Sequence, residues 1–132
     1  MSLAIRNLTR ALAPHLPYRT LTKQILGARY ELSLVLIGNT RARSLNRTWR
    51  GKDYPANILT FPLDHQMGEI FLNLNQTSNF SPQQLFIHGL LHLKGYAHGS
   101  RMDALETRYG QNHRHRTRRR HSVSESRRLR NH

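Results

Sequence analysis

The stretch from Ser81 to His98 reads SPQQLFIHGLLHLKGYAH and predicts a helix, a turn and a set of three histidines. Ser81, Pro82 and Gln84 form the pattern of a capping box with proline at the first helical position. We expect the helix to end at Gly95, because glycine readily adopts the left-handed backbone that closes a helix. The helix runs through the apolar residues Leu85, Phe86, Leu90, Leu91 and Leu93.

The residues before this helix alternate between strand and helix patterns. The predicted order is a strand at 3–7, a helix over 18–26, a strand at 30–38, a helix from 39 or 40, and strands at 57–63 and 68–74. In the second helix we expect Ala42, Leu45 and Trp49 to form the buried stripe. A last helix is predicted from Ser100. This order indicates an α/β (α+β) fold with a mixed four-stranded sheet and helices packed on it.

The three histidines of the opening stretch have metal-ligand spacing. His88 and His92 are four residues apart and therefore lie on one face of the helix. Gly95 lets the chain reverse, so that His98 can approach the pair from another direction, as a tetrahedral metal requires. We expect His88, His92 and His98 to hold one metal with a position left open. Imidazole ligands suit several metals, nickel among them, and the geometry favours zinc.

The residue after the first histidine decides between reaction classes. The spacing H-x-x-x-H-x-x-G-x-x-H is that of metzincin proteases, which need a glutamate at this position as general base. Here the position is Gly89, so we expect no proteolysis by that route. A metal could still activate water or stabilise charge on a phosphoryl oxygen.

Four blocks of the sequence together resemble the YbeY family of bacterial endoribonucleases. They are the histidine segment, WRGKDYP at 49–55, ILTFP at 58–62 and GEI at 68–70. The resemblance extends from about Leu3 to Tyr109. It implies a single-strand-specific, zinc-dependent endoribonuclease that acts in 16S rRNA 3′-end maturation and ribosome quality control. It further implies cytoplasmic localisation, RNA and the ribosome as partners, and no small-molecule cofactor.

The resemblance also implies residue roles. The three metal ligands fall on His88, His92 and His98, and a functionally important arginine falls on Arg50. A guanidinium there suits bidentate phosphate binding, although the position alone is equally consistent with a solvated surface arginine. The sequence departs from the family pattern at Ala97, where the family has an aspartate before the third histidine, and at Ala56-Asn57, where it has Thr-Asp. Loss of the aspartate would weaken the support of the metal site.

Positive charge is divided between two parts of the chain. The 132 residues hold 21 Lys and Arg against 7 Asp and Glu, a formal net charge of +14. Residues 1–110 contribute half of this excess and form the predicted RNase domain. Residues 111–132 contain eight Arg and one Glu, and we expect a disordered tail that binds phosphates. The spacing of Arg43, Arg47 and Arg50 fits an RNA-facing row and a solvated face equally well.

Composition excludes several other classes. The chain has no cysteine, so a disulfide framework, a thiolate metal site and a cysteine nucleophile are excluded. Its longest apolar run, Leu34 to Ile37, is far too short for a membrane span, and no membrane partner is expected. The alternative to an endoribonuclease is a catalytically weak, zinc-binding RNA-binding or ribosome-assembly factor, which Ala97 and the tail favour.

Overall fold

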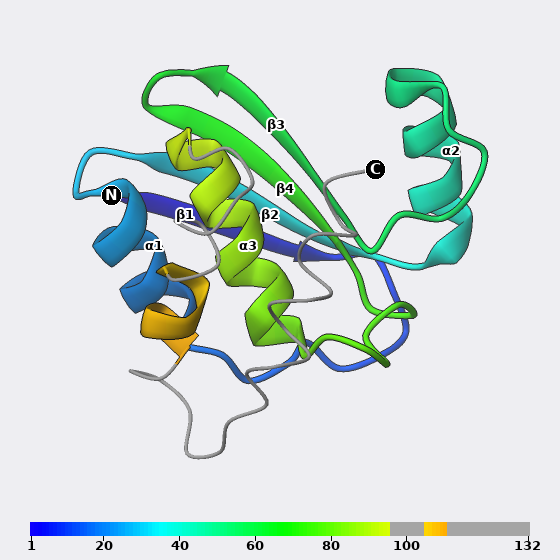
Figure 1. Cartoon of the computed structure of the whole chain (residues 1–132), viewed down its shortest axis with the longest axis horizontal. Coiled ribbons are helices and arrows are strands. Elements are labelled where there is room, and N and C mark those ends of the chain that lie inside the picture. The colour runs from blue at the N-terminus through cyan, green and yellow to red at the C-terminus, as the bar shows by residue number, and fades with distance from the viewer. Residues whose placement is uncertain (96–104, 111–132) are drawn as a thin grey trace.

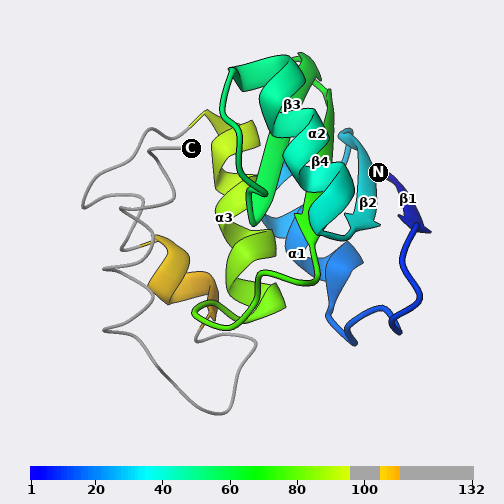
Figure 2. The same cartoon turned by 90° about the vertical axis from the view of Figure 1, so that its right-hand side faces the viewer.

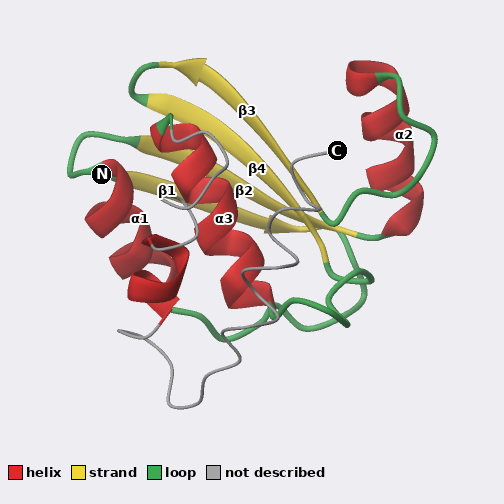
Figure 3. Ribbon diagram, viewed as in Figure 1, coloured by secondary structure: helices red, strands yellow, loops and turns green. Residues whose placement is uncertain are grey.

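The fold is organised around one sheet that carries helices on both faces (Figures 1 and 3). The computed structural model describes residues 1–95 and 105–110, and 105–110 are helical. The elements in chain order are β1 (Ser2–Asn7), α1 (Tyr18–Leu26), β2 (Glu31–Ile37), α2 (Asn39–Arg50), β3 (Ile58–Asp64), β4 (Met67–Asn73) and α3 (Pro82–Lys94). All seven were predicted from the sequence to within one or two residues at each end.

The sheet is mixed and has the strand order β1-β2-β4-β3. β2 runs parallel to both β1 and β4, and β3 pairs with β4 as an antiparallel hairpin. The helices α1 and α2 follow β1 and β2, which suits the crossover connections that parallel strands need. The prediction of a mixed four-stranded sheet with packed helices is confirmed.

The main core lies between one face of the sheet and the helices α1 and α3. Alternate residues of β2 and β4, such as Leu34 and Ile70, point into it and meet Leu21 of α1 and Phe86 of α3. Leu105 and Tyr109, from the helical residues near the C-terminus, pack against the same cluster. Figure 2 shows α3 and α2 on opposite sides of the strands. A smaller cluster of Val35, Ile37 and Ala42 lies under α2.

The start and the end of α3 follow the sequence prediction. The Gln84 backbone N–H donates to Ser81 Oγ at 3.1 Å, and the Ser81 N–H donates to Gln84 Oε1 at 2.8 Å. Such a cap stabilises a helix by about 0.5–2 kcal/mol. Gly95 closes the helix with a φ of 107°, a left-handed conformation that favours glycine. Both ends of the helix that carries His88 and His92 are therefore defined by local sequence.

Helix α2 differs from its prediction in two respects. Its N-cap is Gly38 rather than Asn39 or Thr40, and the Asn39 N–H donates to Asn75 Oδ1 from the loop after β4. Trp49 is wrongly predicted as buried: it is 68% exposed, whereas Asn46 on the same helix is fully buried. Asn46 donates to the Tyr54 carbonyl oxygen at 3.0 Å, so the helix turns a polar side chain inward to hold the loop that follows it.

Within residues 1–95 and 105–110, no helix has the length and apolarity needed to cross a membrane.

Candidate metal centre

His88 and His92 face each other one helical turn apart on α3. Their Nε2 atoms are 3.0 Å apart, and their ring centroids are separated by 4.5 Å. His88 is only 2% exposed, whereas His92 is half-buried and accessible from solvent. The pair therefore has one member fixed inside the protein and one at its surface.

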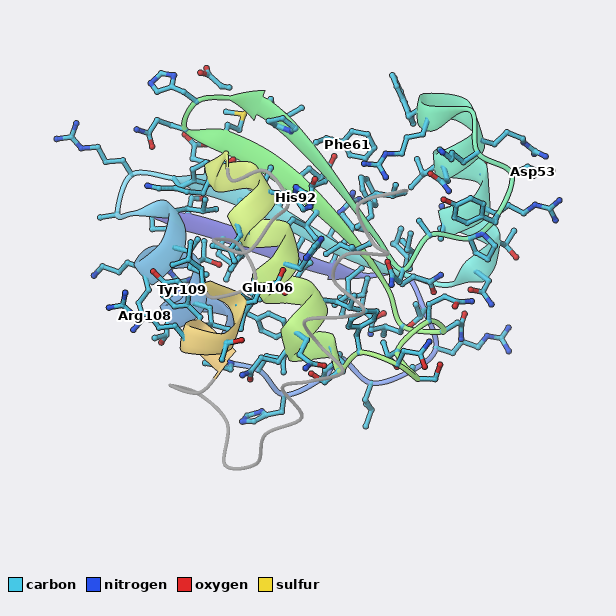
Figure 4. The ribbon with its side chains drawn as sticks, viewed as in Figure 1. Asp53, Phe61, His92, Glu106, Arg108 and Tyr109 are labelled. Atoms are coloured by element: carbon cyan, nitrogen blue, oxygen red, sulfur yellow. The ribbon has the colours of Figure 1, made fainter. Side chains whose placement is uncertain are left out.

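Glu106 holds the buried member of the pair. Its side chain is 10% exposed, and Oε2 accepts a short hydrogen bond from His88 Nδ1. Figure 4 labels His92, which belongs to α3, and Glu106, which belongs to the helical residues 105–110. Because Nδ1 is engaged as a donor to a carboxylate, the lone pair of a neutral His88 is on Nε2, the atom that faces His92. A carboxylate behind a histidine is the usual support of a metal-binding imidazole.

The donor set fits a zinc ion. Zinc–nitrogen bonds of about 2.0–2.1 Å in a tetrahedron place two imidazole nitrogens about 3.3 Å apart, close to the observed 3.0 Å. Among residues 1–95 and 105–110, no group of three His, Cys, Asp or Glu is placed to hold a metal. The third predicted ligand, His98, and the neighbouring Ala97 lie outside the described residues. The pair thus supplies two of the three expected nitrogens.

At Gly89 the helix α3 lies close against the sheet. A Cβ atom on Gly89 would lie 2.7 Å from Ile58 Cδ1, 3.1 Å from Ile70 Cδ1 and 3.3 Å from Thr60 Cγ2. A glutamate here would drive its carboxylate into this apolar contact, at a cost of several kcal/mol. The absence of a protease-type general base is therefore also a packing requirement of this helix on this sheet.

Comparison with known proteins identifies the family of the chain. A family model described as endoribonuclease YbeY matches residues 4–115 of the chain. The chain belongs to the YbeY family. The match includes both described histidines, Glu106 and Arg50, so the sequence resemblance is confirmed at the level of the family.

Individual YbeY relatives are identical to this chain at about a third of the aligned positions. A curated protein of Anaeromyxobacter sp., named endoribonuclease YbeY, is 36% identical over 90 residues, which cover 56% of this chain and 47% of that protein. One from Bordetella petrii with the same name is 37% identical over 100 residues, covering 61% of this chain and 64% of its own. The chain spans about half to two thirds of the length of the curated relatives it matches.

A solution structure of a protein from Thermotoga maritima supports the YbeY fold. It superposes with a TM-score of 0.54 over 95% of this chain and 91% of that chain, at 21% sequence identity. At that identity the likeness concerns the arrangement of strands and helices alone.

Arg50, the arginine that the YbeY resemblance singled out, is the last residue of α2 and is exposed. Within the described part of the chain it forms no ion pair. The other two arginines of the predicted row do: Arg43 Nε lies 2.8 Å and Arg47 Nη1 3.4 Å from Asp53 Oδ1. The hydrogen bond from Arg43 holds the pKa of the Asp53 carboxyl below its usual range. The row is thus divided: among the described residues, Arg43 and Arg47 share Asp53, and Arg50 has no ion-pair partner.

The two carboxyls nearest to the site in the sequence pattern have structural partners. Asp64 lies at the β3–β4 turn, where a hydrogen bond from the His65 backbone N–H lowers the pKa of its carboxyl. Glu69 accepts from the Ser33 hydroxyl at 3.0 Å across β2 and β4. Asp64 thus serves the turn, and Glu69 links two neighbouring strands. The carboxylate that does reach the histidines, Glu106, was not predicted, because nothing in its spacing distinguishes it from other acids on the last helix.

Proposed function

We propose that this chain is a metal-dependent endoribonuclease that cleaves single-stranded RNA. The observation that carries the proposal is the convergence of His88 Nε2 and His92 Nε2, with Glu106 behind His88. Its context is a family whose curated members are named endoribonucleases. The basic character of the chain provides the attraction that a polyanionic substrate requires.

The proposed roles follow from the positions of the side chains. His88, His92 and His98 would hold one zinc ion. When bound, the ion supplies Lewis acidity, which polarises a phosphate and activates water for attack. Glu106 keeps the His88 ring in the orientation and tautomer that direct Nε2 outward. Arg50 binds a phosphate of the substrate through its fork of N–H donors.

The cellular substrate is proposed from the family resemblance. It is the 3′ end of 16S rRNA, cleaved during maturation and ribosome quality control in the cytoplasm. An unpaired strand at an RNA end exposes its phosphates and bases, which a surface arginine such as Arg50 can reach.

The test combines metal analysis with an RNA assay. Protein purified without an affinity tag should contain close to one zinc per chain, and it should cleave a labelled single-stranded oligoribonucleotide. A chelator should abolish cleavage, and added zinc should restore it, while a fully double-stranded RNA stays intact. Cleavage that persists unchanged in the metal-free protein would contradict the proposal.

The alternative is an RNA-binding ribosome-assembly factor with a structural zinc. The observation that favours it is Ala97, which lacks the carboxylate that the family pattern has before the third histidine. Tight binding of single-stranded RNA by the zinc-loaded protein, with no cleavage under any divalent metal, would select this alternative.

The Arg-rich segment 111–132 is proposed as a phosphate-binding arm. Each phosphate contact to single-stranded RNA contributes about −0.7 to the slope of log K against log salt concentration. Deleting the eight arginines should therefore lower RNA affinity and flatten its salt dependence, while the zinc content stays unchanged. Loss of zinc on this deletion would contradict the separation of the arm from the metal site.

A further inference from the structure

The only tryptophan of the chain is one of its most exposed large apolar residues. Trp49 lies in the last turn of α2, and 68% of its surface is accessible to solvent. An indole has two large apolar faces, so leaving it in water forgoes much of the free energy that burial would give. The proposed metal site makes no use of this side chain.

Trp49 belongs to a row of three aromatic rings. Its ring lies edge-to-face with Phe61 of β3, with centroids 6.2 Å apart, and Phe61 meets Phe71 of β4 in the same way at 5.7 Å. Phe61 and Phe71 are both partly exposed. We call Trp49, Phe61 and Phe71 the aromatic platform. Phe61 contacts the indole and Phe71 backs Phe61, while Trp49 remains 68% exposed.

The aromatic platform lies on the face of the sheet opposite to α3. Thr60 points toward α3, where its methyl group is close to Gly89, and its neighbour Phe61 therefore points to the other face. Figure 4 shows Phe61 at β3 and His92 on α3, which belong to different layers of the fold. A ligand on the platform would thus be held apart from the His88–His92 pair.

The surroundings of the aromatic platform are strongly basic. Residues 39–55, which contain α2 and the loop after it, hold five Lys and Arg against the single acid Asp53. Asp53 is occupied by Arg43 and Arg47. Arg50 and Lys52, on either side of Gly51, are exposed and form no ion pair within the described residues. An open aromatic ring flanked by unpaired cations is the combination that binds single-stranded nucleic acid, because bases stack while phosphates meet positive charge.

We propose that the aromatic platform binds single-stranded RNA outside the metal site, with a base stacked on Trp49 and the adjoining phosphates held by Arg50 and Lys52. The inference rests on the proposed function for the identity of the ligand, an RNA strand. It adds a second contact, which would hold the strand at a distance from the bond that is cut. Base stacking tolerates any sequence, so the contact would select single strands rather than particular bases.

The experiment uses Trp49 as its own probe. Because the chain has one tryptophan, its fluorescence reports on this ring alone. Metal-free full-length protein is titrated with a short single-stranded oligouridylate and, separately, with an abasic ribose-phosphate chain of the same length. We expect saturable quenching by the oligouridylate and little quenching by the abasic chain, which carries the same charge but no bases.

Variants then measure the contribution of the ring to affinity, read from the anisotropy of labelled oligonucleotides. Trp49→Ala should weaken oligouridylate binding about 5- to 150-fold and leave binding of the abasic chain unchanged. Trp49→Phe should restore most of the loss, since an aromatic face remains. The matched control is Leu12→Ala, which removes another exposed apolar side chain, 93% accessible, from the loop after β1 and should change neither affinity.

Two results would overturn the inference. The first is equal affinity of the intact protein for the oligouridylate and the abasic chain. The second is unchanged oligouridylate affinity in Trp49→Ala. The second result would leave the aromatic platform as a contact for a protein partner. Chelator-sensitive RNA cleavage together with either result would mean that the inference fails and the proposed function stands. Base-dependent quenching in a protein that cleaves no RNA would mean that the inference stands and the proposed function fails.

Discussion

Helices α2 and α3 pack on opposite faces of one sheet and differ in how much of each helix is buried. α3 is buried along most of its length, and His88 within it is 2% exposed and held by Glu106. α2 buries two of its twelve residues, Ala42 and Asn46, and leaves its cations in solvent. Metal ligation needs nitrogen atoms in fixed directions, which a packed core supplies. Binding a flexible polyanion needs charge and open rings, which a solvated helix supplies.

The strongest test of this contrast removes a histidine from the buried helix. His92→Ala should abolish stoichiometric zinc binding and lower RNA cleavage by more than about 100-fold, because the Lewis acid contributes several kcal/mol. Elemental analysis and the cleavage assay measure the two effects. The matched control is His65→Ala, which removes an 85% exposed imidazole at the β3–β4 turn and should change neither quantity. Full zinc content in His92→Ala would show that the site lies elsewhere.

A second test keeps both histidines and changes Glu106, the carboxylate that contacts His88. Glu106→Gln removes the negative charge that holds His88 Nδ1, and zinc affinity should fall about 10- to 100-fold. Competition with a chromophoric chelator measures this affinity independently of RNA cleavage. The comparison variant Glu69→Gln changes a carboxylate that is bound to Ser33 instead, and its zinc affinity should equal that of the unaltered protein. Equal affinities in all three proteins would exclude a supporting role for Glu106.

A third test concerns the packing of α3 on the sheet. Gly89→Ala places a methyl group within 2.7 Å of Ile58 Cδ1, and such overpacking costs about 1–3 kcal/mol. The higher helix propensity of alanine offsets about 1 kcal/mol, so we expect a net loss of about 1 kcal/mol in the free energy of unfolding. Denaturant unfolding measures it. The exposed α2 variant Ser44→Ala should show no loss, and a stabilised Gly89→Ala would mean that the helix lies further from the sheet.

The smallest change in stability is expected from the ion pair between Arg43 of α2 and Asp53 in the loop that follows. The pKa of Asp53 is held below its usual value first by the hydrogen bond from Arg43. Its contribution to stability is therefore present above about pH 4, the unfolded value, and is lost as pH falls through the folded value. Both partners are exposed, so Asp53→Asn should lower stability only slightly at neutral pH, and the difference from the unaltered protein should vanish in acid. Thermal unfolding across a pH series measures this, and a difference that grows in acid would contradict the assignment.

Local patterns in the sequence determined the secondary structure and two of the candidate ligands. The capping box at Ser81 and the glycine at residue 95 delimit α3 through contacts within one or two turns, so they can be read without the rest of the molecule. The i,i+4 spacing likewise places His88 beside His92 in any regular helix. The apolar run from Leu34 to Ile37 predicts a strand covered on both faces, and β2 contributes to the clusters on both sides of the sheet.

Only the tertiary structure decided which surfaces these elements present. The stripe of α2 predicted Ala42 as buried, which is confirmed, and Trp49 as buried, which is wrong: Asn46 takes the second inward position and the indole is 68% exposed. Glu106 meets His88 across eighteen positions of sequence, a contact that depends on how a later helix returns to α3. Periodicity specifies a face of a helix, whereas burial and long-range partners depend on what that face meets. The sequence alone therefore predicted the histidine pair, and the fold was needed to show its carboxylate and the open aromatic ring on the other side of the sheet.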